Sequence, residues 1–91
     1  MRESEVETYL KKRVEEVGGE TRKLQYKGRH GATDRLVLLH GRHFVAEMKR
    51  PRKDAEAHQA REHKILRWAG FEVHVIDTKE KVDKVLSCII V

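Results

Sequence analysis

The chain has 91 residues, of which 38% are hydrophobic, so it has enough apolar material for one domain with one modest core. No stretch reaches the roughly 18 apolar residues of a membrane span and no secretion signal opens the chain, which argues against a membrane or secreted protein. The net charge of +5 and a pI near 9.6 favour a polyanionic partner, and the single cysteine, Cys88, fits a reducing cytoplasm.

The positive charge is concentrated in the middle third of the chain. Residues 21–53 carry 10 basic side chains and only 2 acidic ones, Asp34 and Glu47, whereas 1–20 and 54–91 have net charges of −2 and −1. The two isolated carboxylates either pair with neighbouring cations on the surface or serve a specific chemical purpose.

The first elements are a helix and a strand. A helix is predicted over 4–17, because apolar side chains recur at helical spacing, namely at Val6, Leu10, Val14 and Val17. Ser4 and Glu7 have the spacing of a capping box, and a pair of glycines after Val17 supplies the stop. A strand is expected over 21–26, followed by a loop over 27–33.

Two strands over 34–40 and 43–49 form the strongest pattern of the sequence. They flank Gly41-Arg42, and a Gly-X pair suits a two-residue hairpin turn. Both strands are apolar on both faces, which predicts that they are covered on both sides.

The remaining elements alternate helix, strand and helix. A basic loop over 50–53 contains a proline that bars strand continuation, and a helix is expected over 55–69, closed by a glycine. A strand over 71–76 follows. Asp77 and Glu80 have the spacing of a second capping box, at the start of a helix whose apolar face carries Val82, Val85, Leu86 and Ile89. The predicted order is therefore α-β-β-β-α-β-α, an α/β fold.

The hairpin places three chemical groups on one face. A turn at Gly41-Arg42 puts Asp34 opposite Lys49 and diagonal to Glu47. Two neighbouring carboxylates favour a divalent cation between them, and oxygen ligands suit Mg²⁺ or Mn²⁺. An ion pair between Lys49 and Asp34 would explain the same spacing without a metal, and the spacing alone leaves both possibilities open. A one-residue slip would move Asp34 to the other face.

Two stretches of sequence resemble a nuclease signature. GATDRLVLL followed by FVAEMKRP is similar to the PD-(D/E)XK pattern, in which an Asp opens one strand and E-x-K ends the next. With Gln59 and the stretch WAGFEVHVI, the chain resembles the virus-type replication-repair nuclease (VRR-NUC) domain over nearly its whole length, although Thr33 stands where the family usually has Pro. The resemblance implies one domain over 1–91 with a restriction-endonuclease-like fold, a mixed sheet flanked by helices.

The resemblance also implies a role for each matching residue. Asp34 and Glu47 would hold a Mg²⁺ or Mn²⁺ ion together with the backbone carbonyl of Met48. Lys49 would orient or deprotonate the attacking water, or stabilise the phosphate in the transition state.

Three further residues have two possible roles each. The family places a first-helix glutamate near the metal, and Glu3 or Glu7 could occupy that place, although Glu7 also suits the capping box. Gln59 shares the inner face of helix 55–69 with His63, where it could position water or phosphate or be an ordinary residue at the rim of the core.

Basic and histidine side chains surround this cluster in the sequence. We expect contacts with the DNA backbone from the basic residues nearest to it, with a solubilising surface as the alternative; these are Arg29, Arg35, Arg50, Arg52 and Lys53. His40 and His43 are expected at the surface or facing DNA, because one cysteine is too few for a zinc site of that kind. His58 and His63 are five residues apart and do not share a ligand face well.

A second stripe of helix 55–69 suggests an interface. It lies opposite Leu66 and consists of Ala57, Arg61, Ile65 and Trp68. A tryptophan away from the inner face often marks an interface, and stand-alone family members resemble two-fold symmetric enzymes, so a homodimer is expected. The alternative is that Trp68 packs against another helix of the same chain.

These features predict a metal-dependent, structure-specific DNA endonuclease that cleaves branched DNA such as Holliday junctions, in the cytoplasm of a bacterium or of a phage's host. The alternative from another class is a nucleic-acid-binding protein that keeps the fold without cutting. A third possibility is a nuclease that acts on flaps, on linear ends or on RNA. Asp34, Glu47 and Lys49 favour an enzyme, because a binding protein does not need that trio.

Overall fold

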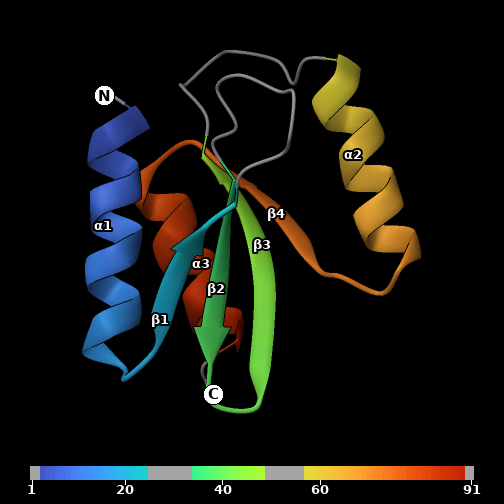
Figure 1. Ribbon diagram of the computed structural model, residues 1–91. Helices are drawn as coiled ribbons and strands as arrows, with labels where there is room; N and C mark the ends of the chain where they lie inside the picture. The colour runs from blue at the N-terminus through green and yellow to red at the C-terminus, as the bar shows by residue number, and fades with distance from the viewer. Residues whose placement is uncertain (1–2, 25–33, 49–56, 90–91) are drawn as a thin grey trace.

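The computed structural model describes residues 3–24, 34–48 and 57–89. Within these ranges the elements follow the predicted order α-β-β-β-α-β-α (Figure 1). They are α1 (Glu3–Glu16), β1 (Glu20–Lys23), β2 (Asp34–Leu39), β3 (Arg42–Met48), α2 (Ala57–Trp68), β4 (Val73–Ile76) and α3 (Lys79–Ile89). None of these helices is long and apolar enough to cross a lipid bilayer.

The strands form a mixed sheet in the order β1-β2-β3-β4. β1 pairs antiparallel with β2 and β2 antiparallel with β3, whereas β4 runs parallel to β3 and is reached through α2. The N–H of Leu24 donates to the carbonyl of Asp34 at 2.9 Å and extends the β1–β2 pairing to the start of β2. The backbone of Asp34 is therefore held between two neighbouring strands.

One face of the sheet packs against α1 and α3, which lie together on the same side in Figure 1. The helices and the sheet interdigitate in one apolar cluster, made of Val6, Leu10, Val14, Val37, Phe44, Ala46, Met48, Ile76, Val82, Val85 and Leu86. Because side chains alternate along a strand, the residues between these core positions point to the opposite face. Asp34, Val45 and Glu47 are among them.

The opposite face packs against α2, next to β4. The guanidinium of Arg67 donates to the carbonyl of Val73 at 3.1 Å and ties the end of α2 to β4. On this face of β2, Leu36 and Leu38 are only half-buried, whereas residues 44–48 of β3 are all buried. The prediction that both hairpin strands are covered on both sides is therefore right for β3 and only partly right for β2.

The hairpin turn lies one residue earlier than predicted. Leu39 pairs with Arg42, so the turn is His40-Gly41, and Gly41 has a φ of 73°. The register is displaced by two residues, and Asp34 pairs with Glu47 instead of with Lys49. Because side chains alternate with a period of two, this displacement leaves Asp34 and Glu47 on the same face, as predicted.

Both predicted capping boxes are wrong. Ser4 lies inside α1, and its carbonyl accepts a bond of 2.8 Å from the Thr8 hydroxyl. At α3 the cap is Thr78 in place of Asp77, because the Thr78 Oγ1 accepts the N–H of Lys81 at 3.1 Å.

Several element ends also differ from the prediction. Val17 lies beyond the end of α1 and is 50% exposed, whereas the other three residues of its stripe are fully buried. β1 begins at Glu20 and β4 at Val73, and residues 25–33 and 49–56 lie outside the described ranges. The glycine stops are confirmed, because Gly18 and Gly70 follow α1 and α2 with φ values of 83° and 100°.

Candidate metal centre

Asp34 and Glu47 face each other across the hairpin. Asp34 is the first residue of β2, Glu47 is the last but one of β3, and the register pairs them directly. Their exposed fractions are 3% and 0%. Taking two neighbouring carboxylates out of water is costly unless positive charge or hydrogen-bond donors compensate.

His63 of α2 joins the two carboxylates. Its Nε2 lies 3.0 Å from Oε2 of Glu47 and 3.9 Å from Oδ2 of Asp34. The histidine is itself 3% exposed. Three elements, β2, β3 and α2, thus each contribute one buried polar side chain to a single cluster, which we call the Asp34–Glu47–His63 cluster.

From the sequence, His63 was expected on the inner face of its helix together with Gln59, but no chemical role was predicted for it. As a possible metal ligand it was weighed only with His58, because helical spacing tells which residues share a helix face. Helical spacing does not tell which strand residues that face will meet. The signal that could have identified His63 is a lone imidazole on the inner face of the helix that follows the E-x-K strand.

The donor set of the cluster suits a divalent cation. One ligand atom from each of the three residues lies within 4.8 Å of the others, and no other described set of three His, Cys, Asp or Glu side chains gathers so closely. In an octahedral site with bonds of about 2.1 Å, neighbouring ligand atoms lie about 3.0 Å apart and opposite ones about 4.2 Å apart. The observed separations of 3.0 and 3.9 Å fall in that range.

Glu7 lies elsewhere in the fold. Its carboxylate accepts a bond of 2.5 Å from Nε of Arg35, and a second bond joins that guanidinium to the Thr21 hydroxyl at 3.1 Å. Arg35 alternates with Asp34 along β2, so this ion pair lies on the α1 face of the sheet, away from the cluster. Arg35, a predicted DNA contact, has a side chain that is 18% exposed and engaged within the fold.

Other predicted site residues are described only in part or lie outside the described residues. Met48 ends β3, and its buried side chain belongs to the apolar core. Glu3 and Gln59 lie in α1 and α2, and the structure describes their backbone but not their side chains. Outside the described residues lie Lys49, Arg29, Arg50, Arg52 and Lys53.

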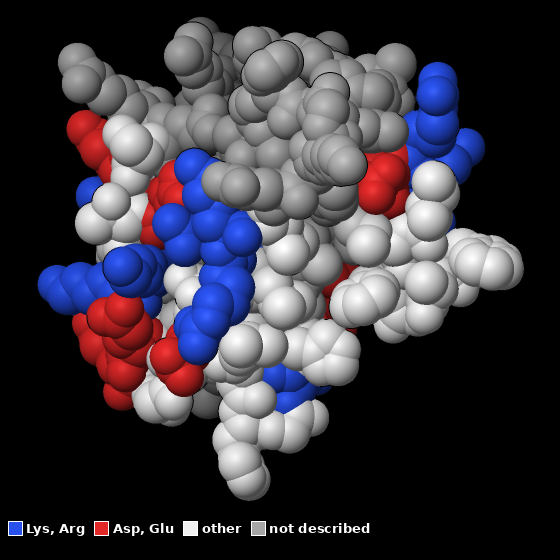
Figure 2. Space-filling model, viewed as in Figure 1, with Lys and Arg blue, Asp and Glu red and all other residues white. Residues whose placement is uncertain are grey.

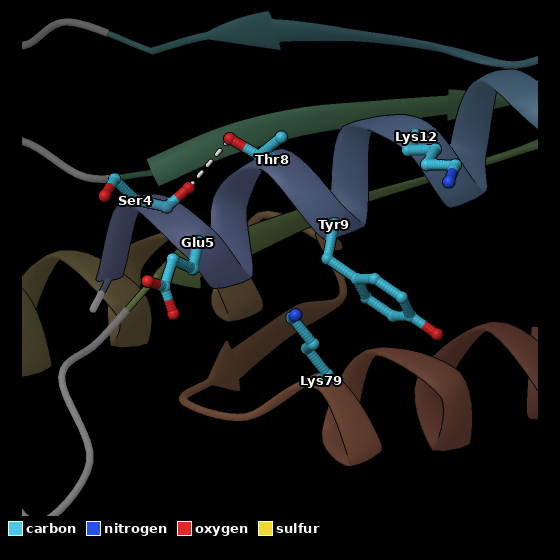
Figure 3. Close-up of a pocket in the computed structure, with 6 residues that line it drawn as sticks. All are labelled: Ser4, Glu5, Thr8, Tyr9, Lys12 and Lys79. Atoms are coloured by element: carbon cyan, nitrogen blue, oxygen red, sulfur yellow. Dashed lines mark hydrogen bonds between the residues drawn. The ribbon is translucent and has the colours of Figure 1, made fainter. Parts of the chain in front are cut away.

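A shallow hollow between α1 and the start of α3 is a separate feature (Figure 3). The hydroxyl of Tyr9 donates to Asp83 at 2.7 Å, and this bond raises the pKa of Tyr9 above its ordinary value. The ammonium of Lys79 lies 5.6 Å from the centre of the Tyr9 ring. These contacts join α1 to α3 on the face of the sheet opposite α2, so the hollow is not continuous with the Asp34–Glu47–His63 cluster.

Comparison with known proteins identifies the family. A solved structure described as "VRR_NUC domain" matches with a TM-score of 0.81 and 40% sequence identity, over 93% of this chain and 94% of that one. The protein named "Putative nuclease p44" of Acyrthosiphon pisum secondary endosymbiont phage 1 is 36% identical over 81 residues, which are 88% of this chain and 87% of that protein. The chain belongs to the VRR-NUC family. A scan against protein-family models finds no match.

Membership of the VRR-NUC family confirms the predicted fold and indicates a nuclease, a hydrolase that acts on DNA. The nuclease fold implies a divalent metal, and the Asp34–Glu47–His63 cluster could bind one. The VRR-NUC domain therefore has a donor set of suitable chemistry at the two carboxylates that were predicted as its acidic ligands.

Proposed function

We propose that this VRR-NUC protein is a single nuclease domain over residues 1–91 that hydrolyses phosphodiester bonds within branched DNA, such as Holliday junctions, in a metal-dependent reaction. The observation that carries the proposal is the direct pairing of two buried carboxylates, Asp34 and Glu47, beside His63. Similarity to a phage protein supports action in a bacterial cytoplasm.

In the proposed mechanism, Asp34, Glu47 and the backbone carbonyl of Met48 would hold a Mg²⁺ or Mn²⁺ ion. When bound, the ion supplies Lewis-acid polarisation of a phosphoryl oxygen and lowers the pKa of water. Lys49 follows Glu47 by two residues, so strand alternation favours the same face, where it would orient or deprotonate the attacking water.

Two residues are proposed to position water or phosphate beside the ion. Glu3 is favoured over Glu7 for the helical carboxylate, because Glu7 is bonded to Arg35 on the other face of the sheet. Gln59 precedes His63 by four residues in α2, and this spacing places the two on the same side of the helix.

The proposed DNA-binding surface lies around the basic middle of the chain. Figure 2 shows Lys and Arg side chains gathered over β1, where Arg22 and Lys23 are exposed. Arg29, Arg50, Arg52 and Lys53, which lie near Asp34 and Glu47 in the sequence, are proposed as further phosphate contacts. Phosphate contacts of this kind carry no sequence information, so Arg52→Ala or Lys53→Ala should weaken binding to all DNA sequences about equally.

A homodimer is also proposed. Trp68 and Ile65 of α2 are 87% and 52% exposed, and Phe71 just after α2 is 37% exposed. The alternative that Trp68 packs against another helix of its own chain is wrong, given that exposure. Large apolar side chains gathered at one end of a helix are typical of an interface, and a two-fold symmetric pair of nuclease sites suits the two strands of a junction.

Cleavage and binding measured separately test the function. Wild-type protein and the variants Asp34→Ala, Glu47→Ala and Lys49→Ala are incubated with Mg²⁺ or Mn²⁺ and labelled junction, fork, flap and linear DNAs. We expect all three variants to lose cleavage while keeping junction binding, and Lys49→Ala to keep metal binding, since an ammonium is not a ligand. Glu15→Gln, which changes an exposed carboxylate of α1, is the matched control and should cut normally.

Three results would contradict the proposal in whole or in part. Undiminished cleavage by Glu47→Ala would exclude this nuclease site. Junction binding by wild-type protein without cleavage of any substrate would favour the DNA-binding protein that keeps the fold without cutting. Preferential cleavage of flaps or linear ends would overturn the junction assignment alone.

A further inference from the structure

The imidazole of His63 is directed at the carboxylates from the far side of the cluster. Asp34 and Glu47 come from adjacent strands, whereas His63 comes from a helix that packs on that face of the sheet. Its Nε2 is the atom nearest to them, 3.0 Å from Glu47 and 3.9 Å from Asp34. The two carboxylates from the sheet and the imidazole from α2 therefore approach one common position from opposite sides.

His63 is also the buried anchor of its helix. Among residues 60–68 of α2, whose burial the structure describes, it alone is buried, while Ile65 and Trp68 on the same helix are exposed. A structural anchor would ordinarily be apolar, because a buried imidazole must satisfy its ring nitrogens. The choice of histidine at this position, with Nε2 turned to two carboxylates, points to a function as a ligand.

A nitrogen ligand affects which metal ion the site prefers. Mg²⁺ prefers oxygen ligands and keeps much of its water, whereas imidazole nitrogen suits several first-row transition ions, the series to which Mn²⁺ belongs. A set of two carboxylates and one imidazole is thus a better match to Mn²⁺ than to Mg²⁺. Without His63, the same two carboxylates would leave an all-oxygen set that does not distinguish the two ions in this way.

We propose that Nε2 of His63 is a further protein ligand of the metal, beside Asp34, Glu47 and the backbone carbonyl of Met48, and makes the site selective for Mn²⁺ over Mg²⁺. This inference rests on the proposed function only in so far as Asp34 and Glu47 hold the ion. A competing role is that His63 orients Glu47 through a hydrogen bond and never touches the ion. That role predicts an equal effect of His63 on both ions, which makes the two roles separable.

The test measures metal binding by the full chain without DNA. Dissociation constants for Mn²⁺ and Mg²⁺ are determined by titration calorimetry for wild type, His63→Ala and His63→Gln, and pulsed electron paramagnetic resonance records nitrogen coupling to bound Mn²⁺. His43→Gln is the matched control, because His43 is exposed and lies on the same face of β3 at its other end. Circular dichroism checks that each variant is folded, and His63→Gln keeps a polar side chain of similar reach.

We expect both His63 variants to bind Mn²⁺ more weakly by roughly 10-fold or more, on the scale known for groups that support a metal, with Mg²⁺ binding changed far less. The nitrogen coupling should be present in wild type and His43→Gln and absent in His63→Gln. Equal losses for both ions, no loss for either, or no nitrogen coupling in wild type would overturn the assignment. If the His63 variants still cleave DNA and keep the wild-type preference between Mn²⁺ and Mg²⁺, this inference fails and the proposed nuclease function stands. If the wild type binds Mn²⁺ through His63 but cleaves no DNA, the nuclease function fails and this inference stands.

Discussion

Asp34 and Glu47 are held in place by the strands that carry them. The backbone of Asp34 bonds to Leu24 of the neighbouring segment, and the hairpin register sets Glu47 directly opposite. Both side chains are buried in the folded protein. A cation that binds between them therefore meets a site whose geometry is already formed, and its binding free energy adds to the stability of the fold.

Asp34→Asn and Glu47→Gln should each remove most of the stabilisation that Mn²⁺ gives the wild-type protein. A ligand that binds only the folded state at ten times its Kd stabilises by about 1.4 kcal/mol, or roughly 6–11 °C in Tm for a domain of this size. Scanning calorimetry with and without MnCl₂ measures the shift, and Glu15→Gln should retain it. An equal shift in Glu47→Gln would show that the ion binds elsewhere.

Glu72 predicts a dependence of stability on pH. Its carboxylate bonds to His74 at 2.5 Å and to Arg42 at 2.8 Å, and these bonds lower the pKa of Glu72 below its ordinary value. A carboxyl whose pKa is lowered by folding stabilises the protein at pH values above its unfolded pKa, and this stabilisation is lost as the pH falls through its folded pKa. Glu72→Gln should therefore cost about 0.5 kcal/mol at neutral pH, a small value because solvent screens these partly exposed pairs.

Urea unfolding of wild type and Glu72→Gln across a pH series measures this difference. The two curves should converge once the pH has fallen below the lowered, folded-state pKa of Glu72, where the carboxylate is protonated in both states of the wild type. If the difference in the free energy of unfolding stayed constant down to that pH, the destabilisation by Glu72→Gln would come from packing instead of from charge.

At the scale of elements, the hairpin shows what sequence could and could not predict. Alternation and helical periods are local properties, so the order of elements and the shared face of Asp34 and Glu47 were predicted correctly. The register was not, because it depends on which turn residue takes a positive φ, and Gly41 takes it as the second turn residue after His40. The predicted register was wrong by two residues, and an even displacement leaves every side chain on the same face of the sheet.

The contact of His63 with the two carboxylates and the residues that cap the helices could not be predicted from local sequence pattern. Which strand residues meet an inward-facing helix residue depends on how α2 docks against β4, and this is decided by tertiary packing. The cap of α3 fell on Thr78 instead of Asp77 because neighbouring residues can both accept the same backbone N–H groups, and the sequence pattern does not decide between them.

The connection between α1 and β1 offers a matched pair of glycines. A Cβ added to Gly19 would meet the carbonyl oxygen of Leu38 at 2.6 Å and Val14 at 2.8 Å, whereas one added to Gly18 would meet nothing within 4 Å. Gly18→Ala should cost about 1–2 kcal/mol, the usual cost of its positive φ. Gly19→Ala should cost more, roughly 2–3 kcal/mol or above, because backbone must move. Urea unfolding of both variants checks the order, which a larger loss for Gly18→Ala would contradict.

At the scale of the whole molecule, the proposed dimer contact and the basic residues of β1 belong to different elements. Figure 2 shows Lys and Arg side chains over β1. The exposed apolar side chains Ile65 and Trp68 lie on α2, which also carries exposed Lys and Arg residues. The proposed dimer contact therefore lies on the helix that carries His63.

Trp68→Gln combined with Ile65→Gln should convert the proposed dimer to a monomer without unfolding it, because both side chains are more than half exposed. Burying such side chains between two molecules is favourable by roughly 25 cal/mol per Å² of apolar surface, and glutamine forgoes that gain. Sedimentation velocity over a range of protein concentrations measures the association. Lys64→Gln on the same helix is the control, and a wild type that sediments as a monomer throughout would exclude this interface.

The apolar cluster that joins α1 and α3 to the sheet contains no side chain of the described part of α2. Among residues 60–68 of α2, only His63 is buried. This helix should therefore open locally more often than the helices that share the core, and its amides should exchange with deuterium first. An ion bound at His63 would hold the helix closed, so Mn²⁺ should slow exchange in α2 selectively, as mass spectrometry of dilute protein can measure. His63→Gln should abolish that protection, while protection of all three helices to the same extent would contradict it. The supply of metal would then set how often this part of the protein opens, including in molecules that have never met DNA.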